Sequence, residues 1–375
     1  MKFILQQKNK TEFLLLRVLG ASGEIILPSF LPAFYPDAQI TEIAPYAFSE
    51  SPVPLPDRNV LFLYDDLNRS VISCADMSDS DWKQAVSDSV ICGRLISLTL
   101  PVSVRKIGRY AFYNCDRLSS LSFYSTTTDL GQGLFTGCSG VRSLSAVVNE
   151  ASRSSLFEVL MELRYPLRVS YYTEAAEKKP SLLKYRLIFP EFYENADENT
   201  PARITVRDLR GSGLMYRNCF ANTQFQIKRY DALFPYAEAL EPTAVSAELA
   251  LCRLEVPTEL SEESASKYRA FLSEHPEIFA DVLLLHLSDG LCSLSDIRTL
   301  FSRSFPGSDF PLLRSRLIDI LSSKGEKAPQ AQGLLPLFMD LNAPASDTLE
   351  KSSASSMTVS ASDQTPGRRR RHFEL

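Results

Sequence analysis

The 375-residue sequence predicts an α+β fold in three parts: a short solenoid of stacked repeats with an N-terminal hairpin cap, a small α+β module, and a C-terminal stack of helices. Three observations predict it. Residues 95–144 contain a sequence repeat with a period of 23 residues. Residues 167–206 contain strand-like segments, and residues 244–323 contain short amphipathic helical segments. The expected boundaries are 1–165 for the repeat part, 166–243 for the module, 244–324 for the helices and 325–375 for a disordered tail.

Four kinds of residue recur at this spacing and define the repeat unit. They are Leu98, Leu121 and Leu144; Gly108 and Gly131; Phe112 and Phe135; and Cys115 and Cys138. Apolar and small polar residues alternate around each leucine, which predicts a strand with one core face and one open face. The phenylalanines should fill the layer from the opposite side, and the cysteines should be small buried residues. An open face of small hydroxyls is a poor candidate for tight binding, because binding hot spots are usually Trp, Tyr or Arg.

The repeat unit resembles a known family. The segments 95–101 (Leu-Ile-Ser-Leu-Thr-Leu-Pro) and 107–112 (Ile-Gly-Arg-Tyr-Ala-Phe) are similar to the BspA-like leucine-rich repeat of many bacterial proteins. A fragment of this pattern recurs at 40–48, but its phenylalanine lies 64 residues before the next one, which is not a multiple of 23. We therefore expect an insertion at about 52–94. The resemblance implies an interaction protein and carries no catalytic residues over to this chain.

The N-terminal segment predicts the cap. Residues 12–19 and 24–28 have strand character and are joined by a turn bounded by glycines, which is typical of a β-hairpin. A hairpin here would cover the first apolar layer, as the ends of stacked repeats require. Residues 79–86 begin with acidic residues and predict a short helix, and the apolar spacing of 154–163 predicts a helix that closes the repeats.

The α+β module contains a candidate anion site. Strands are expected at 167–172, 183–189 and 202–206, with a polar loop at 194–201. The candidate anion-binding residues are Arg210, Gly211, Ser212, Gly213 and Arg217. A Gly-Ser-Gly turn offers backbone N–H groups, and two flanking guanidiniums would add positive charge. A simple turn with solvated arginines is the alternative interpretation.

Helices and a tail complete the chain. Helical periodicity predicts helices at 247–254, 261–272, 277–287, 293–302 and 310–322. Past Lys324 we expect order to fade, because the serine-rich run at 352–363 has too few apolar residues to fold. The candidate partner-docking residues are Arg368, Arg369, Arg370, Arg371, Phe373 and Leu375. Their charge would steer an acidic partner and their apolar side chains would anchor it, whereas a merely solubilising tail is the alternative.

Composition bounds the location and the partners. The net charge of −5 argues against a general nucleic-acid binder, and no apolar run is long enough for a membrane span. The N-terminal apolar run stops after three residues, so we expect no signal peptide. Seven cysteines without a Cys-x-x-Cys pair fit a reducing, cytoplasmic setting and no zinc-ligand spacing. A cell-surface location by a non-standard route is the alternative, since many proteins with this repeat are exported.

The chemistry-bearing residues point away from catalysis. The chain has three histidines and no metalloprotease, serine hydrolase, phosphate-loop or dinucleotide signature. We therefore expect no enzyme activity, no cofactor and a protein partner, with oligomeric state left open. The predicted function is a non-catalytic protein–protein interaction scaffold. The alternatives are a surface or secreted adhesin-like repeat protein, and an anion-binding regulator or cryptic enzyme that uses the loop from Arg210 to Arg217.

Overall fold

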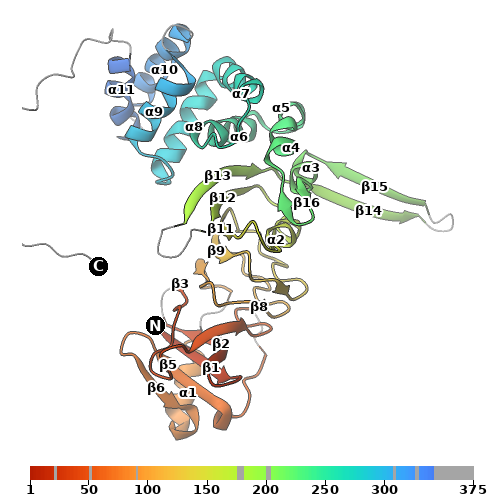
Figure 1. The fold of residues 1–375 in the computed structure, drawn as a ribbon, viewed down its shortest axis with the longest axis vertical. Coiled ribbons are helices and arrows are strands. Elements are labelled where there is room, and N and C mark those ends of the chain that lie inside the picture. Colours follow the sequence, from red (N-terminus) through yellow and green to blue (C-terminus); the bar gives the residue numbers. More distant parts are fainter. Residues whose placement is uncertain are drawn as a thin grey trace, which may run out of the picture.

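The computed structural model describes residues 1–20, 23–49, 53–89, 92–174, 181–199, 204–306, 310–325 and 329–341. These residues form mixed sheets and eleven α-helices, which fits the α+β class. An N-terminal sheet lies at one end of an elongated molecule, the stacked repeat strands follow, and the C-terminal helices lie at the other end (Figure 1). None of the described helices has the length and apolar character that crossing a bilayer requires.

The repeat strands lie side by side in one six-stranded sheet. Its strands, in spatial order, are β13 (Leu182–Phe189), β12 (Leu167–Thr173), β11 (Ser143–Val148), β9 (Ser120–Tyr124), β7 (Ser97–Thr99) and β3 (Glu24–Ile26). All neighbours are parallel except β12 and β13. Leu98 pairs with Leu121, which pairs with Leu144, so the 23-residue alignment is confirmed. The sheet continues from β11 into β12, across the boundary expected at residue 165.

A second ladder and a column of aromatic rings fill the other side of each unit. The ladder consists of β4 (Gln39–Ile43), β8 (Lys106–Ile107) and β10 (Asp129–Leu130), all parallel. Phe48, Phe112 and Phe135 stack with centroid distances of 5.7 and 5.4 Å and nearly parallel planes. The Sγ of Cys115 donates to the carbonyl of Phe48 at 3.3 Å, and that of Cys138 donates to Phe112 at 2.9 Å. The phenylalanines and cysteines therefore occupy the buried positions that the repeat predicts.

Each unit needs a left-handed backbone at one shared position. Tyr46, Tyr110 and Gly133 occupy it with φ of 57°, 54° and 62°. The ring of Tyr46 stacks on that of Tyr110 at 5.4 Å. A Cβ on Gly133 would lie 2.5 Å from the ring of Tyr110, so the third unit requires glycine there. Ring stacking offsets part of the strain that a left-handed tyrosine carries.

The expected hairpin at residues 12–28 is wrong. Strand β2 (Glu12–Leu19) pairs antiparallel with β1 (Lys2–Gln7) and parallel with β4, whereas β3 joins the other sheet. The reason is that β3 belongs to the first repeat unit: Ile25 pairs with Leu98 at the core position. The insertion supplies the rest of the cap, since β5 (Leu61–Asp65) pairs with β1, β6 (Ser70–Ser73) pairs with β5, and α1 (Asp79–Ser87) follows.

A helix ends the repeat ladder at its other end. The N–H of Phe48 donates to Ala111 at 2.9 Å, and the N–H of Phe112 donates to Leu134 at 3.2 Å, so each unit uses carbonyls of the next. The third unit has no such neighbour. Its Phe135 N–H instead donates to the carboxylate of Glu162 at 3.1 Å. Glu162 is the last residue of α2 (Leu156–Glu162), the helix predicted to close the repeats.

The α+β segment departs from expectation at its polar loop. Residues 194–199 of that expected loop are paired instead, because β14 (Tyr193–Asn199) and β15 (Ile204–Arg210) form an antiparallel hairpin that projects from the body (Figure 1). Shorter elements follow: α3 (Gly213–Arg217), β16 (Phe220–Ala221), β17 (Gln224–Phe225), α4 (Ile227–Ala232) and α5 (Phe234–Leu240). They connect the sheet to the C-terminal helices.

The five predicted C-terminal helices are confirmed, and a sixth was missed. The five are α6 (Thr243–Glu255), α7 (Glu262–Glu274), α8 (Pro276–Ser288), α9 (Leu294–Ser304) and α10 (Pro311–Lys324). The sixth, α11 (Pro329–Leu341), lies where the tail was expected to begin, so that expectation is wrong for residues 329–341. It forms because it buries apolar side chains on the stack: Phe338 packs edge-on against Phe301 at 4.7 Å. Its internal Pro336 hid the helical pattern in the sequence.

We predict that Phe112→Ala lowers the free energy of unfolding by about 3–5 kcal/mol, because it removes the middle ring of the column. Chemical denaturation followed by circular dichroism measures this. Tyr113→Ala, at the half-buried neighbouring position, is the control and should lose less than half as much. A loss below about 1 kcal/mol for Phe112→Ala would contradict the aromatic column as the core of the repeats.

Candidate functional site

The structure buries Arg217, which the sequence placed at an anion site. Its side chain has 0% exposed area, and its five N–H donors all reach main-chain carbonyls. The acceptors are Leu160, Leu163, Tyr165, Pro190 and Gly213, at distances up to 3.2 Å. Burial lowers the pKa of this guanidinium to about 9. Arg217 thus ties α2 and the loop after it to α3, and it does not face an external anion.

The neighbouring turn already binds a carboxylate from its own chain. The backbone N–H and the hydroxyl of Ser212 both donate to Glu241, at 2.5 and 2.7 Å. Gly211 supplies the left-handed turn with φ of 76°, Gly213 begins α3, and the guanidinium of Arg210 lies 5.8 Å from the ring centre of Tyr193. The expected anion site is therefore corrected: the two arginines do not converge, and Glu241 takes the N–H group of the turn.

The second set of predicted site residues cannot be placed. Arg368 to Arg371, with Phe373 and Leu375, lies outside the described residues, so its docking role stays a prediction.

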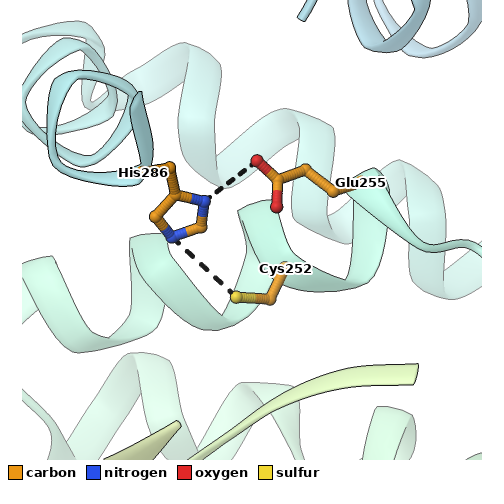
Figure 2. Close-up of side chains that lie close together, drawn as sticks. All are labelled: Cys252, Glu255 and His286. Carbon is orange, nitrogen blue, oxygen red and sulfur yellow. Dashed lines mark hydrogen bonds and ion pairs between the residues drawn. The ribbon is translucent and has the colours of Figure 1, made fainter. Parts of the chain in front are cut away.

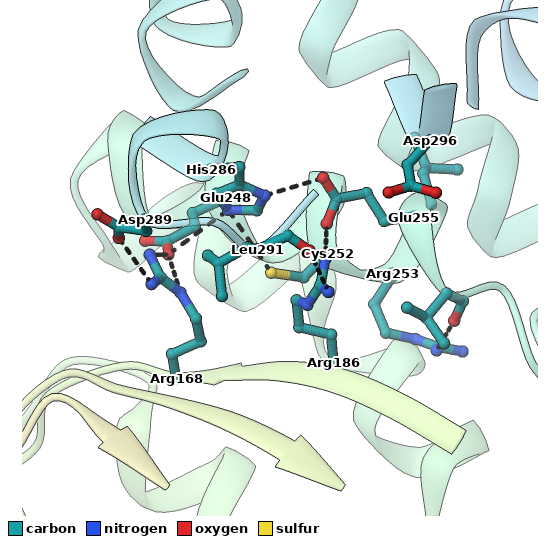
Figure 3. Close-up of polar contacts among 12 residues, drawn as sticks. Arg168, Arg186, Glu248, Cys252, Arg253, Glu255, His286, Asp289, Leu291 and Asp296 are labelled. Atoms are coloured by element: carbon teal, nitrogen blue, oxygen red, sulfur yellow. Dashed lines mark hydrogen bonds and ion pairs between the residues drawn. The ribbon is translucent and has the colours of Figure 1, made fainter. Parts of the chain in front are cut away.

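A cluster of polar and charged residues, most of them buried or half-buried, joins the repeat sheet to the C-terminal helices, and we call it the polar joint. Its members are Arg168, Arg186, Glu248, Cys252, Glu255, His286 and Asp289. Arg168 on β12 and Arg186 on β13 extend from the sheet toward α6 and α8 (Figure 3). Arg168 donates to Glu248 at 2.9 Å and to Asp289 at 3.0 Å. Arg186 forms an ion pair with Glu255 and donates to the Leu291 carbonyl at 2.8 Å.

Helical spacing places three members of the joint on one face of α6. Glu248, Cys252 and Glu255 are separated by four and then three residues, so they share a stripe. His286 on α8 faces this stripe: its Nδ1 lies 2.9 Å from a Glu255 oxygen, and its Nε2 lies 4.0 Å from the Cys252 sulfur (Figure 2). Glu248 stands on the same side, 3.8 Å from Nε2.

The joint is electrically balanced when His286 carries a proton. Three cations, Arg168, Arg186 and protonated His286, then face three carboxylates, those of Glu248, Glu255 and Asp289. Burial by itself would lower the pKa of His286, but contacts with Cys252, Glu248 and Glu255 outweigh it and raise the pKa to about 12. Burial would likewise raise the pKa of Glu248, yet His286 and Arg168 together hold it below its usual value.

The Cys252–His286–Glu255 set has the connectivity of a catalytic nucleophile, its base and an orienting carboxylate. Two observations argue against that chemistry. Cys252 and His286 both have 0% exposed area, so no substrate reaches the sulfur in this conformation. Burial also raises the pKa of Cys252, which favours the thiol over the nucleophilic thiolate. The same donor set is suited to holding a soft metal ion, or to locking the helices onto the sheet.

A groove opens beside the polar joint. It is a cavity of about 540 Å³ between the open face of the repeat sheet and helices α6 and α8. Its floor includes Ser120 and Ser143, which pair in register on the outer row of the sheet. Its helical wall includes Leu285, which is 42% exposed, and Glu248 of the joint. Arg142 stands at the groove with its guanidinium 5.6 Å from the ring centre of Tyr165.

Comparison with known proteins concerns the repeat part. Residues 90–159 match the family model for a BspA-type leucine-rich repeat region of six copies. This chain carries a BspA-type leucine-rich repeat region. A solved leucine-rich repeat protein of T. pallidum shares 18% identity, with 43% of this chain and 77% of that one covered, but its TM-score of 0.19 lends no weight to an argument about fold. No curated protein matches the chain.

The groove and the joint combine the BspA-type repeat region with segments that the match does not reach. Ser120 and Ser143 belong to the matched residues, whereas the helical wall and the joint lie beyond residue 159. Sequence reasoning missed the joint because its members come from β12, β13, α6 and α8, and no short spacing joins Cys252 to His286. The stripe Glu248, Cys252, Glu255 was the one available signal, since it places three polar residues on the face of a mostly buried helix.

We predict that Arg217→Lys lowers the free energy of unfolding by at least about 2 kcal/mol, because a lysine reaches fewer carbonyls and each buried carbonyl left without a donor costs about 1–3 kcal/mol. Thermal and chemical denaturation measure this. Arg210→Lys, at the exposed end of β15, is the control and should lose less than half as much stability. Equal effects of the two substitutions would refute the structural role of Arg217.

Proposed function

We propose that this protein is a non-catalytic, solenoid-like scaffold that binds a protein partner in the groove between its repeat sheet and its C-terminal helices. The observation that carries the proposal is the groove itself: Val245 and Leu285 of the helices face the starts of β9, β11 and β12 across a cavity of about 540 Å³. The BspA-type match supports an interaction role, since leucine-rich repeats usually mediate contacts between proteins.

The two sides of the groove contribute differently. The serines of the floor are small, uncharged and half-buried, and we expect them to fit a partner's backbone while supplying little affinity. The wall supplies the apolar anchor, because Leu285 is 42% exposed beside half-buried Val245. Arg142 and Arg168 place guanidiniums at the same cavity. A partner segment that presents one apolar side chain next to polar backbone fits this combination.

The polar joint sets the shape of this groove. Arg168 binds Glu248 of α6 and Asp289 just after α8, and all three residues line the cavity. The angle between the sheet and the helices is therefore fixed by charged hydrogen bonds, of which the one to Glu248 is partly buried. A groove held rigid before binding loses less conformational entropy when a partner enters.

We predict that Leu285→Glu abolishes capture of the specific partner, because it places a charge on the apolar wall. The measurement is quantitative affinity capture from the native cell extract with the full chain as bait. Leu312→Glu is the matched control: Leu312 is a leucine on α10, 64% exposed and outside the residues that line the groove. Partners held by the groove should fall at least about tenfold with Leu285→Glu and stay with Leu312→Glu, a difference of about 1.4 kcal/mol.

Equal recovery of every partner by the two leucine variants would place the interface elsewhere. Because both leucines are exposed, neither change should unfold the chain, and a thermal melt of each variant verifies this.

We also propose that the tail from Arg368 to Leu375 contributes a second contact, with arginines that accelerate encounter and apolar residues that anchor. We predict that the double substitution Phe373→Ala, Leu375→Ala weakens capture of the partner. The binding that remains comes from the arginines and is sensitive to salt. The comparison uses three forms of bait: intact, doubly substituted and truncated after Ala343. If all three recover the same partners equally, the tail serves solubility alone.

A further inference from the structure

One nitrogen of the polar joint lacks a close partner. The Nδ1 of His286 has a Glu255 oxygen at 2.9 Å, whereas on the Nε2 side the Glu248 oxygen lies at 3.8 Å and the Cys252 sulfur at 4.0 Å. The first distance exceeds the roughly 2.7–3.2 Å of an ordinary hydrogen bond, and the second is at the outer limit for sulfur. Both atoms therefore face a buried nitrogen from beyond ordinary hydrogen-bond distance.

We propose that these atoms form a binding site for a soft divalent cation, best Zn²⁺, held by His286 Nε2, Cys252 Sγ and the carboxylate of Glu248, whose Oε1 also accepts from Arg168. Two tetrahedral ligands at a Zn–S length of about 2.3 Å and a Zn–N length of about 2.0 Å lie about 3.5 Å apart. The sulfur and nitrogen stand at 4.0 Å, so shifts of a few tenths of an ångström close the site. Thiolate, imidazole and carboxylate are all ligands that zinc accepts.

The surroundings of the ring fit a metal-bound histidine. Glu255 accepts from Nδ1 and is itself paired with Arg186, so the ring presents the Nε2 lone pair toward Cys252 and Glu248. A carboxylate on the far nitrogen of a metal-bound imidazole is the usual arrangement, because it fixes both tautomer and orientation. The donor atoms of Cys252, Glu255 and His286 all lie within 4.8 Å of one another, so the carboxylate of Glu255 is close to the site as well.

Charge allows a metal to replace protons here. With His286 protonated and Cys252 a thiol, the pair carries one positive charge. Zinc binding releases both protons and adds two positive charges to one thiolate, which again leaves one positive charge. The balance of the joint against its three carboxylates and two arginines is therefore the same in both states. Proton release also means that zinc affinity rises with pH.

The neighbouring groove reaches one ligand of the site. Glu248 lines the groove, while Cys252 and His286 lie behind it with no exposed area. An ion in the groove meets the Glu248 carboxylate first and must displace side chains to reach the sulfur and the nitrogen behind it. Two ligands come from α6 and one from α8, so a bound ion would cross-link these helices where they meet the sheet. This inference is independent of the proposed partner.

The test uses the full chain without a histidine tag, stripped with a chelator and then titrated with zinc chloride against a chromophoric zinc indicator. We expect one zinc per chain that survives buffer exchange. Cobalt is the spectroscopic probe: a thiolate-to-cobalt charge-transfer band on the wild-type chain would show sulfur ligation directly, without any variant. A chain that holds less than about a tenth of an equivalent of zinc, or that shows no such band, would overturn the proposal.

Variants locate the site. Cys252→Ala should weaken zinc binding by more than about 100-fold, and Glu255→Gln, which changes the group behind the ligand, by about 10–100-fold. Cys219→Ala is the matched control, because Cys219 is equally buried but lies next to α3, where its thiol contacts Met215. Equal zinc affinity of the Cys252 and Cys219 variants would assign the metal to another place. Should Cys252→Ala fail to fold, the zinc affinity of Glu255→Gln locates the site instead.

Discussion

The stacking of one repeat unit on the next governs the architecture. The Phe112 N–H has its acceptor in the following unit, and its ring has partners on both sides, so no unit is complete alone. Each end must then be closed by something that is not a repeat. At one end the closure is β2 with β1 and the strands of the insertion, and at the other it is the Glu162 carboxylate. The cap, the insertion and α2 are consequences of this single requirement.

The polar joint meets a different requirement, that of attaching helices to a sheet through charged residues. Removing charges from water is costly, and the attraction between opposite charges offsets that cost. Here Arg168, Arg186 and His286 each bind a carboxylate, and Arg186 also binds a backbone carbonyl. Purely apolar packing would tolerate several orientations of the helices. The directed hydrogen bonds of the joint select one, and with it the shape of the groove.

Sequence reasoning succeeded where the information is local or periodic. The spacing of 23 identified the paired leucines and the aromatic column, and helical periodicity found α6 to α10. It failed where a partner lies far away in the sequence. Strand β3 reads as half of a hairpin because its true partner, β7, follows the insertion, and α11 is helical because of the surface that it covers.

The candidate site shows the same division. The loop at Arg210 looks like an anion site locally, but Glu241 and the carbonyls around Arg217 are tertiary partners. The polar joint has no signature in any short stretch of sequence, because His286 contacts Cys252 and Glu255 only when α8 packs beside α6. Burial and charge pairing are properties of the folded structure, and they determine what these side chains can bind.

The insertion between the first and second units has a consequence for the order in which the chain assembles. Phe112 and Phe135 are 23 residues apart, whereas Phe48 and Phe112 are 64 apart, so closing the first interface costs about 1 kcal/mol more chain entropy than closing the second. Strand β1 also pairs with β5, which lies in the insertion, so the N-terminal sheet is complete only after the insertion has folded. The second and third units are therefore the natural nucleus, and the N-terminal strands, although they precede these units in the chain, are among the last to find their neighbours.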